Sequence, residues 1–216
     1  MLKMTIGLLA ALLLAATPYP AMAPLGQYLM PGNAEIVLAR SAAPASISAN
    51  ATVLVLGRDG YTTAVRGTNG FTCLVERSWT AGIDDPEFWN PKLRGPNCYN
   101  AAATRSYVPI VLMRTKLILA GKSKADAFAA VTAALDSGQL PALERGAMCY
   151  MMSKQQYLND QAKAWHPHLM FFVPLKTGQD SGANLTGSPV MSTDDPQDRL
   201  TILMVVVRHW SDGTKA

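Results

Sequence analysis

The sequence predicts an α+β fold: a single antiparallel sheet of about five or six strands, with two or three helices packed on it. Three observations support this. Short β-rich runs follow one another near residue 50, separated by Asp-Gly and Asn-Gly pairs, which are typical of hairpin turns. Two segments of helical composition occupy the middle of the chain, and near-continuous apolar runs fill the last third. The strands therefore fall into two groups on either side of the helices.

The N-terminus has the layout of a secretory signal peptide. One lysine precedes the apolar run Ile6–Ala16, and a small-residue pattern ends at Ala23. The run is shorter than the roughly 20 apolar residues that cross a bilayer. Pro24 disfavours a cut after Ala23, so a different cleavage site and a retained anchor both stay open. We expect a secreted or periplasmic protein in which residues 1–23 are the signal peptide and 24–216 form a single domain, without a membrane span after cleavage.

The charge balance argues against a nucleic-acid partner. The formal net charge is +4 and the chain has no basic run of five residues, whereas nucleic-acid binding needs a strong basic patch. A small molecule or a protein remains as the expected partner, and the oligomeric state is open.

Three cysteines in an exported chain allow one disulfide and one remaining thiol. We predict Cys73–Cys98, because this pair closes the shortest loop and Cys98 follows a Gly-Pro-Asn segment that can adapt to a strand. The alternative is that Cys73, Cys98 and Cys149 are all buried thiols. Cys149 has apolar neighbours that would raise the pKa of its thiol and make it a poor nucleophile.

The first half of the chain predicts a helix and a three-stranded antiparallel meander. Asn33 is placed to cap a helix over Ala34–Arg40. The strands are expected at Ala51–Gly57, Tyr61–Arg66 and Phe71–Arg77. In the third strand, alternation places Thr72, Leu74 and Glu76 on one face of the sheet and Cys73, Val75 and Arg77 on the other.

The middle of the chain predicts an irregular loop and two helices. Residues 78–99 are rich in proline, glycine and aspartate, so we expect a surface loop there. The first helix is expected from about Asn100 to Ala120, and Pro109 should bend it or mark a second start. The second helix is expected to open at Ser123 and to end before Gly138.

The last third predicts three strands at Ala147–Met152, Leu169–Val173 and Leu200–Val207, with a loop over residues 174–199. If the last two strands pair antiparallel, the start of one lies near the end of the other. His166, His168 and His209 would then meet at one edge of the sheet.

Three imidazoles with an open fourth position resemble the ligand set of catalytic zinc, which acidifies a bound water for hydrolysis. Glu76 is the best candidate for a fourth ligand or a general base. Copper is the variant favoured by the soft donors nearby, Met148, Cys149, Met151, Met152 and Met170. The His-x-His pattern is short, however, and histidines that only cap strand ends by hydrogen bonding are the simpler interpretation.

A second hypothesis comes from the aromatic residues of the long loop. Trp79, Phe88, Trp89 and Tyr99 could line a small-molecule pocket or anchor a partner, or they could seal the edge of the core. The sequence contains no complete catalytic set. A small-molecule- or partner-binding accessory module is therefore the first expectation, and a metal-dependent hydrolase-like enzyme the alternative.

Overall fold

The computed structural model describes residues 18–176 and 180–216 of the chain. It contains one mixed sheet of eight strands, in the order β2-β1-β3-β4-β5-β6-β8-β7. The strands are β1 (Thr52–Gly57), β2 (Gly60–Val65), β3 (Thr72–Glu76), β4 (Gly95–Tyr99), β5 (Met148–Met151), β6 (His168–Pro174), β7 (Val190–Asp195) and β8 (Leu200–Val206). The predicted single antiparallel sheet of five or six strands is therefore wrong.

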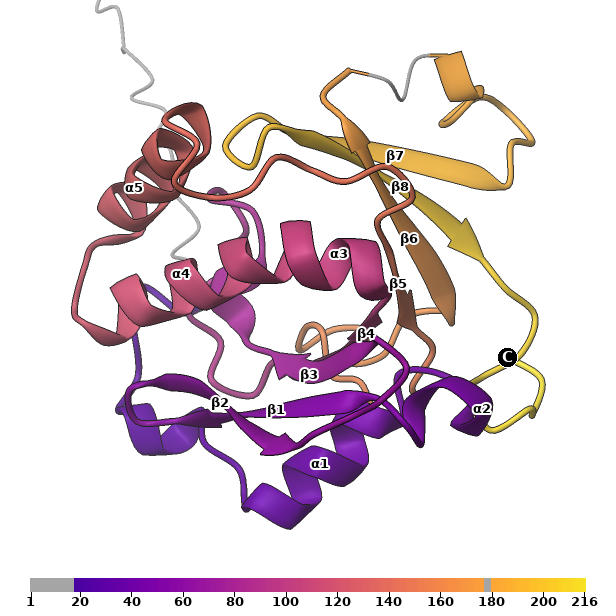
Figure 1. The fold of residues 1–216 in the computed structure, drawn as a ribbon, viewed down its shortest axis with the longest axis horizontal. Helices are drawn as coiled ribbons and strands as arrows, with labels where there is room; N and C mark the ends of the chain where they lie inside the picture. The colour runs from indigo at the N-terminus through magenta and orange to yellow at the C-terminus, as the bar shows by residue number, and fades with distance from the viewer. Residues whose placement is uncertain (1–17, 177–179) are drawn as a thin grey trace, which may run out of the picture.

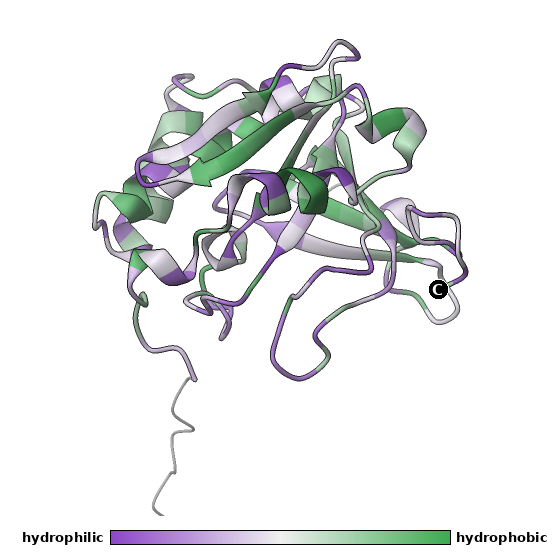
Figure 2. Cartoon of the chain, turned by 90° about the horizontal axis from the view of Figure 1, so that it is seen from below, coloured by the Kyte–Doolittle hydropathy of each residue, from purple (hydrophilic) through white to green (hydrophobic). Residues whose placement is uncertain are grey.

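The helices cover both faces of the sheet (Figure 1). The α-helices are α1 (Gly32–Arg40), α2 (Ala45–Ser48), α3 (Ala101–Ser106), α4 (Val108–Leu119) and α5 (Lys124–Asp136), and the 3-10 turns are η1 (Leu25–Gln27) and η2 (Ser78–Thr80). The short helices α1 and α2 lie on one face, and α3, α4 and α5 lie on the other. Hydrophobic residues concentrate along the strands and hydrophilic residues along the connecting loops (Figure 2).

The predicted three-stranded meander is correct for its first two strands and wrong for the third. β1 and β2 form the antiparallel hairpin, with Gly57 opposite Gly60, but β3 pairs in parallel with β1 rather than with β2. The connection crosses the start of β1 so closely that a Cβ on Gly67 would lie 2.2 Å from the backbone nitrogen of Thr52. The Asn69 side chain bonds Ile47 O and Phe71 N. The Asn-Gly pair therefore belongs to a crossover and not to a hairpin.

Two strands lie in segments that the sequence predicted to be loops. β4 falls inside 78–99 and is buried along its whole length between β3 and β5. β5 pairs with β4 only at Cys98 and Tyr99, so Pro96 has a paired strand on one side only, at Val75 of β3. Proline is tolerated at such a position because it has no backbone N–H to donate to a second strand. β7 falls inside 174–199 and forms an edge of the sheet beside β8.

The helix boundaries follow local chemistry. α1 begins at Gly32 after the extended Pro31, so Asn33 lies inside the helix and does not cap it. The segment 100–120 is two helices, and Pro109 stands in the first turn of the second, where its missing N–H is harmless. Ser123 caps α5 by accepting the backbone N–H of Asp126, as predicted. None of the helices in the described part of the chain is long and apolar enough to cross a membrane.

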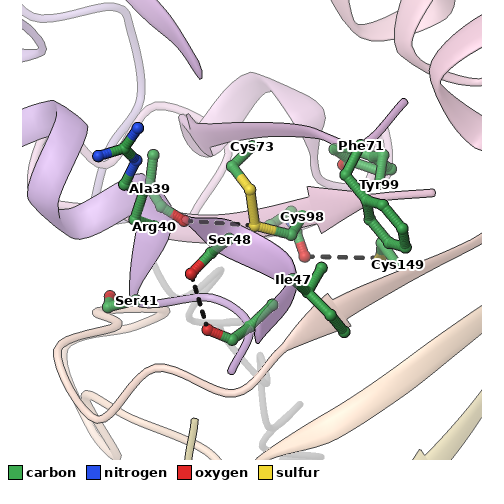
Figure 3. Close-up of a disulfide and its surroundings, with 12 residues drawn as sticks. Ala39, Arg40, Ser41, Ile47, Ser48, Phe71, Cys73, Cys98, Tyr99 and Cys149 are labelled. Atoms are coloured by element: carbon green, nitrogen blue, oxygen red, sulfur yellow. Dashed lines mark hydrogen bonds between the residues drawn. A yellow bond between two sulfur atoms is a disulfide. The ribbon is translucent and has the colours of Figure 1, made fainter. Parts of the chain in front are cut away.

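The disulfide Cys73–Cys98 is confirmed. Its two residues are direct partners in the β3–β4 pairing, with 4.0 Å between their Cα atoms. Figure 3 shows the bond beside α1, where the sulfur of Cys98 lies 3.7 Å from the carbonyl oxygen of Ala39. Cys149, on the neighbouring strand β5, is a buried free thiol.

Part of the predicted signal peptide, residues 1–17, lies outside the described residues. Residues 18–23, the remaining part of that segment, are described, and Tyr19 and Ala23 among them contact the fold. The Tyr19 hydroxyl hydrogen-bonds Asp160, and the Ala23 backbone N–H donates to the Tyr28 hydroxyl over 3.2 Å. A cut after Ala23 would remove both contacts, because Tyr19 and Ala23 lie in the removed segment. Export and its cleavage site stay predictions.

Candidate functional site

The last two predicted strands pair antiparallel, with His168 opposite Val206. This brings the three histidines to the same end of the β6–β8 pair, as the sequence analysis expected, but in different environments. The His168 side chain is buried, and its Nδ1 lies 2.7 Å from the carbonyl oxygen of His166. The ring of Trp165 covers it at a centroid distance of 4.7 Å. Burial lowers the pKa of His168 and favours its neutral form.

His166 and His209 line one surface hollow of about 450 Å³ together with Arg208 and Lys215. His168 is not among the residues that line it. Glu76 lies at the end of β3, three strands from β6, and lines a different cavity. Across residues 18–176 and 180–216, no three His, Cys, Asp or Glu side chains are placed to hold a metal ion.

The zinc or copper site therefore stays a prediction, with two of its three histidines in one hollow. Elemental analysis of the purified protein tests it. Stoichiometric zinc or copper that is lost in His168→Ala would establish the site. A metal-free protein that keeps its fold would remove it, together with the hydrolase-like activity that depends on it.

Glu76 lines a cavity of about 230 Å³ on the face of the sheet covered by α3 and α4. The predicted strand alternation is correct, because Leu74 of this face packs in the cluster with α3, α4 and α5, whereas Cys73 and Val75 pack against α1. The cavity is lined by Glu76, Thr80, Ala81, Asp85, Leu93, Gly95, Asn97, Tyr99, Tyr107, Met151, Leu158, Met170, Phe172 and Ile202.

Register explains why the polar residues of β3 and β4 meet. Thr72 pairs with Tyr99 and Leu74 with Asn97, so the side chains of Asn97 and Tyr99 project on the same face as Glu76. The Tyr99 hydroxyl donates to Glu76 Oε1, and Asn97 Nδ2 donates to Oε2 over 3.1 Å. Thr80 Oγ1 lies 3.2 Å from Oε2. Two neighbouring strands and the turn after β3 thus converge on one carboxyl group.

The environment of Glu76 shifts its proton affinity. Burial raises its pKa, and the hydrogen bonds from Tyr99 and Thr80 and the positive charge of Arg114 oppose this rise. Burial also raises the pKa of Tyr99 well above its usual value, so Tyr99 keeps its proton and remains a donor. Glu76 can therefore change its protonation state closer to neutral pH than an exposed glutamate can.

The hydrogen-bond network extends from Glu76 to Cys149. The Sγ atom of Cys149 lies 3.6 Å from Asn97 Oδ1. Burial, reinforced by the negative charge of Glu76, raises the pKa of Cys149 well above its usual value. The thiol thus stays protonated and weakly nucleophilic, in line with the sequence-based expectation.

One wall of the cavity is aromatic. The rings of Tyr107 and Phe172 stack with 4.1 Å between centroids and 14° between planes, and Tyr99 stacks beside Phe172 at 6.2 Å. Met151 and Ile202 extend this apolar wall. Of the four loop aromatics that the sequence proposed as a pocket lining, Tyr99 alone borders this cavity. Trp79 and Phe88 are buried in a separate core cluster, where Trp79 Nε1 donates to Thr115 over 3.0 Å.

The cavity adjoins an outer hollow of about 610 Å³, with which it shares Thr80, Ala81, Asp85, Tyr107 and Ile202. The outer hollow lies between the loop after η2 and the end of β7. Four aspartates line it: Asp84, Asp85, Asp194 and Asp195. No lysine or arginine of the described chain lines either hollow. The inner cavity and the acidic outer hollow together are called the Glu76 cleft below.

Comparisons with protein-family models, with curated proteins and with solved structures found no match to this chain.

Proposed function

We propose that this protein binds a small molecule in the Glu76 cleft. The proposal rests on the inner cavity, where apolar and aromatic side chains surround one carboxyl group that has several hydrogen-bond partners. Ligand sites in proteins typically combine mostly apolar walls with a few fixed polar groups and a titratable residue of shifted pKa.

The contacts favour binding over catalysis. The nearest nucleophile in the network, Cys149, is held as a protonated thiol. Glu76 is surrounded by Tyr99, Asn97 and Thr80, which can orient a carboxyl group or a ligand atom. These groups recognise a polar atom and do not form a nucleophile–base pair.

The proposed location is outside the cytoplasm, secreted or periplasmic. The Cys73–Cys98 disulfide supports it, because the cytosol keeps thiols reduced. Mapping the oxidation state of the cysteines in the protein taken from its source, discussed below, tests this.

Gly95 offers a direct test of the cleft. A Cβ at this position would lie 3.3 Å from Met151 Cε and 3.6 Å from Glu76 Cβ, so a larger side chain enters the inner cavity. In a ligand-observed NMR screen of mixed fragments, we expect fragments to bind the wild type and to lose affinity by about tenfold or more in Gly95→Val, equivalent to about 1.4 kcal/mol.

The matched control is Gly26→Val. Gly26 lines neither part of this cleft and lies in an exposed turn, where a Cβ would meet nothing within 4 Å. Thermal unfolding confirms that both variants fold. The proposal fails if the screen yields no binder, or if every binder has the same affinity for the wild type and for Gly95→Val.

A further inference from the structure

We propose that the ligand of the Glu76 cleft is a small organic cation, an amine or amidine carried on an apolar body. This rests on the proposed function and adds the charge of the ligand. The inference comes from the negative charges that surround the cleft and from the two nearby arginines, Arg77 and Arg114, which are paired with other carboxylates.

The Glu76 carboxyl group has hydrogen-bond partners but no cation in contact. The next residue, Arg77, projects to the opposite face, where it pairs with Glu35 at 2.8 Å. Arg114 on α4 pairs with Asp198 in a buried contact. Within residues 18–176 and 180–216, no salt bridge involves Glu76. A bound cation would supply the missing countercharge to a carboxylate in a desolvated site, where such pairing is strong.

The entrance to the cavity adds negative charge. None of the four aspartates of the outer hollow forms a salt bridge with a described lysine or arginine. Asp85, Asp194 and Asp195 accept hydrogen bonds from neutral groups, such as Thr201 Oγ1 to Asp194 over 2.5 Å and Asp198 N to Asp195 over 3.0 Å. The chain as a whole carries a net charge of +4. The cleft is thus a local negative region on a positive protein, which attracts cations and repels anions.

The walls select an organic cation over a metal ion. Met151, Phe172 and Ile202 offer no ligand oxygen or nitrogen to a metal, and their burial by a ligand requires apolar surface on that ligand. Hard cations such as calcium need six or more oxygen ligands, and no group of three metal-ligating acids exists among the described residues. An ammonium or amidinium group on a ring or chain satisfies both the carboxylate and the walls.

The test uses three probes of the same ring and length that differ in charge: benzylammonium, benzyl alcohol and benzoate. We expect the wild type to bind benzylammonium about tenfold tighter than benzyl alcohol, and benzoate weakest, by calorimetry or ligand-observed NMR. In Glu76→Gln, the affinity for benzylammonium should fall about tenfold while that for benzyl alcohol changes less than about twofold.

Two further variants distinguish the contribution of Glu76 to cation binding from that of the aspartates in the outer hollow. Asp194→Asn should weaken benzylammonium binding by less than Glu76→Gln and reduce its salt dependence, because Asp194 is exposed to solvent at the entrance. Glu144→Gln is the matched control, since Glu144 is a surface carboxylate paired with Arg105 and lines neither part of the cleft. It should leave all three affinities unchanged.

The affinity for benzylammonium should also depend on pH. As pH falls through the raised pKa of Glu76, the carboxylate takes up a proton and the affinity falls, while the affinity for benzyl alcohol stays constant. Four ionisable groups near Glu76 stay protonated because burial raises their pKa values: Tyr61, Tyr99, Tyr107 and Cys149. Arg114 stays charged, and Asp85 lies at the boundary of the two hollows. Asp85→Asn should therefore retain this pH dependence.

The outcomes distinguish the two proposals. If benzyl alcohol or benzoate binds as tightly as benzylammonium, or if Glu76→Gln leaves benzylammonium binding unchanged, the cation inference is overturned. Small-molecule binding then still stands, provided that Gly95→Val blocks it. If none of the three probes binds while other fragments do, the inference is equally overturned. If no fragment binds at all, both proposals fail.

Discussion

Arg77→Met is expected to destabilise the protein by about 3–5 kcal/mol, the largest effect of any single substitution predicted from this structure. The guanidinium of Arg77 donates Nη2 to Glu35 Oε1 at 2.8 Å and Nε to the carbonyl oxygen of Tyr28 at 2.7 Å. Glu35 Oε1 also accepts the backbone N–H of Leu56. One cation thus joins α1, β1, the end of β3 and the segment before α1, and both charged side chains are inaccessible to solvent.

The expected loss of stability is large because the substitution leaves two buried polar groups without their partner. Without Arg77, the buried carboxylate of Glu35 loses its countercharge, and the Tyr28 carbonyl loses its donor. Urea unfolding measures the loss. Adding Glu35→Leu to Arg77→Met removes the uncompensated charge, so we expect the double variant to be more stable than the sum of the single variants predicts, by about 2 kcal/mol.

An exposed pair of the same chemistry is the control. Arg105 forms two hydrogen bonds to Glu144 on the surface, at 2.8 and 2.6 Å. Arg105→Met should lower the free energy of unfolding far less than Arg77→Met, because solvent screens the exposed pair and hydrates the carboxylate that remains. An Arg77→Met variant as stable as Arg105→Met would show that the buried pair does not hold these segments together.

Sequence alternation was sufficient to place single residues on the faces of β3. The same pattern assigned Leu74 and Glu76 to one face and Cys73 to the other, and the structure agrees. Alternation reports the direction of side chains within one strand, which depends on local geometry alone. Which strand lies beside β3 depends on a crossover at Gly67, and a short loop with Asn-Gly does not distinguish a crossover from a hairpin.

The partners of Glu76 were missed because their strands contain residues that usually break strands. Asn97 and Tyr99 follow Gly95 and Pro96, and β7 ends in two aspartates. One signal could have revealed β4. The predicted disulfide already required Cys98 to lie beside Cys73, and a residue cross-linked to a buried strand commonly belongs to a neighbouring strand. Alternation from Cys98 would then have placed Asn97 and Tyr99 on the face of Glu76.

Removing the disulfide is expected to have the second largest effect. Cys73 and Cys98 are separated by 25 positions in sequence, and the bond closes this loop in the unfolded chain. The lost restriction corresponds to about 3 kcal/mol, or roughly 6–12 °C in melting temperature for a chain of this size. The variant Cys73→Ala/Cys98→Ala, and the wild type with a reductant, should both show this loss in thermal unfolding.

Cys149 provides the control and the link to location. Cys149→Ala also removes a buried sulfur, but its stability should decrease further by about 3 kcal/mol when the reductant is added, because its disulfide is intact. Alkylation of the denatured protein from its source, followed by mass mapping, should label Cys149 and leave Cys73 and Cys98 joined. Labelling of all three cysteines would mean that the bond does not form where the protein resides. That result would remove the main support for an oxidising compartment, and the signal-peptide pattern would then be the remaining argument for export.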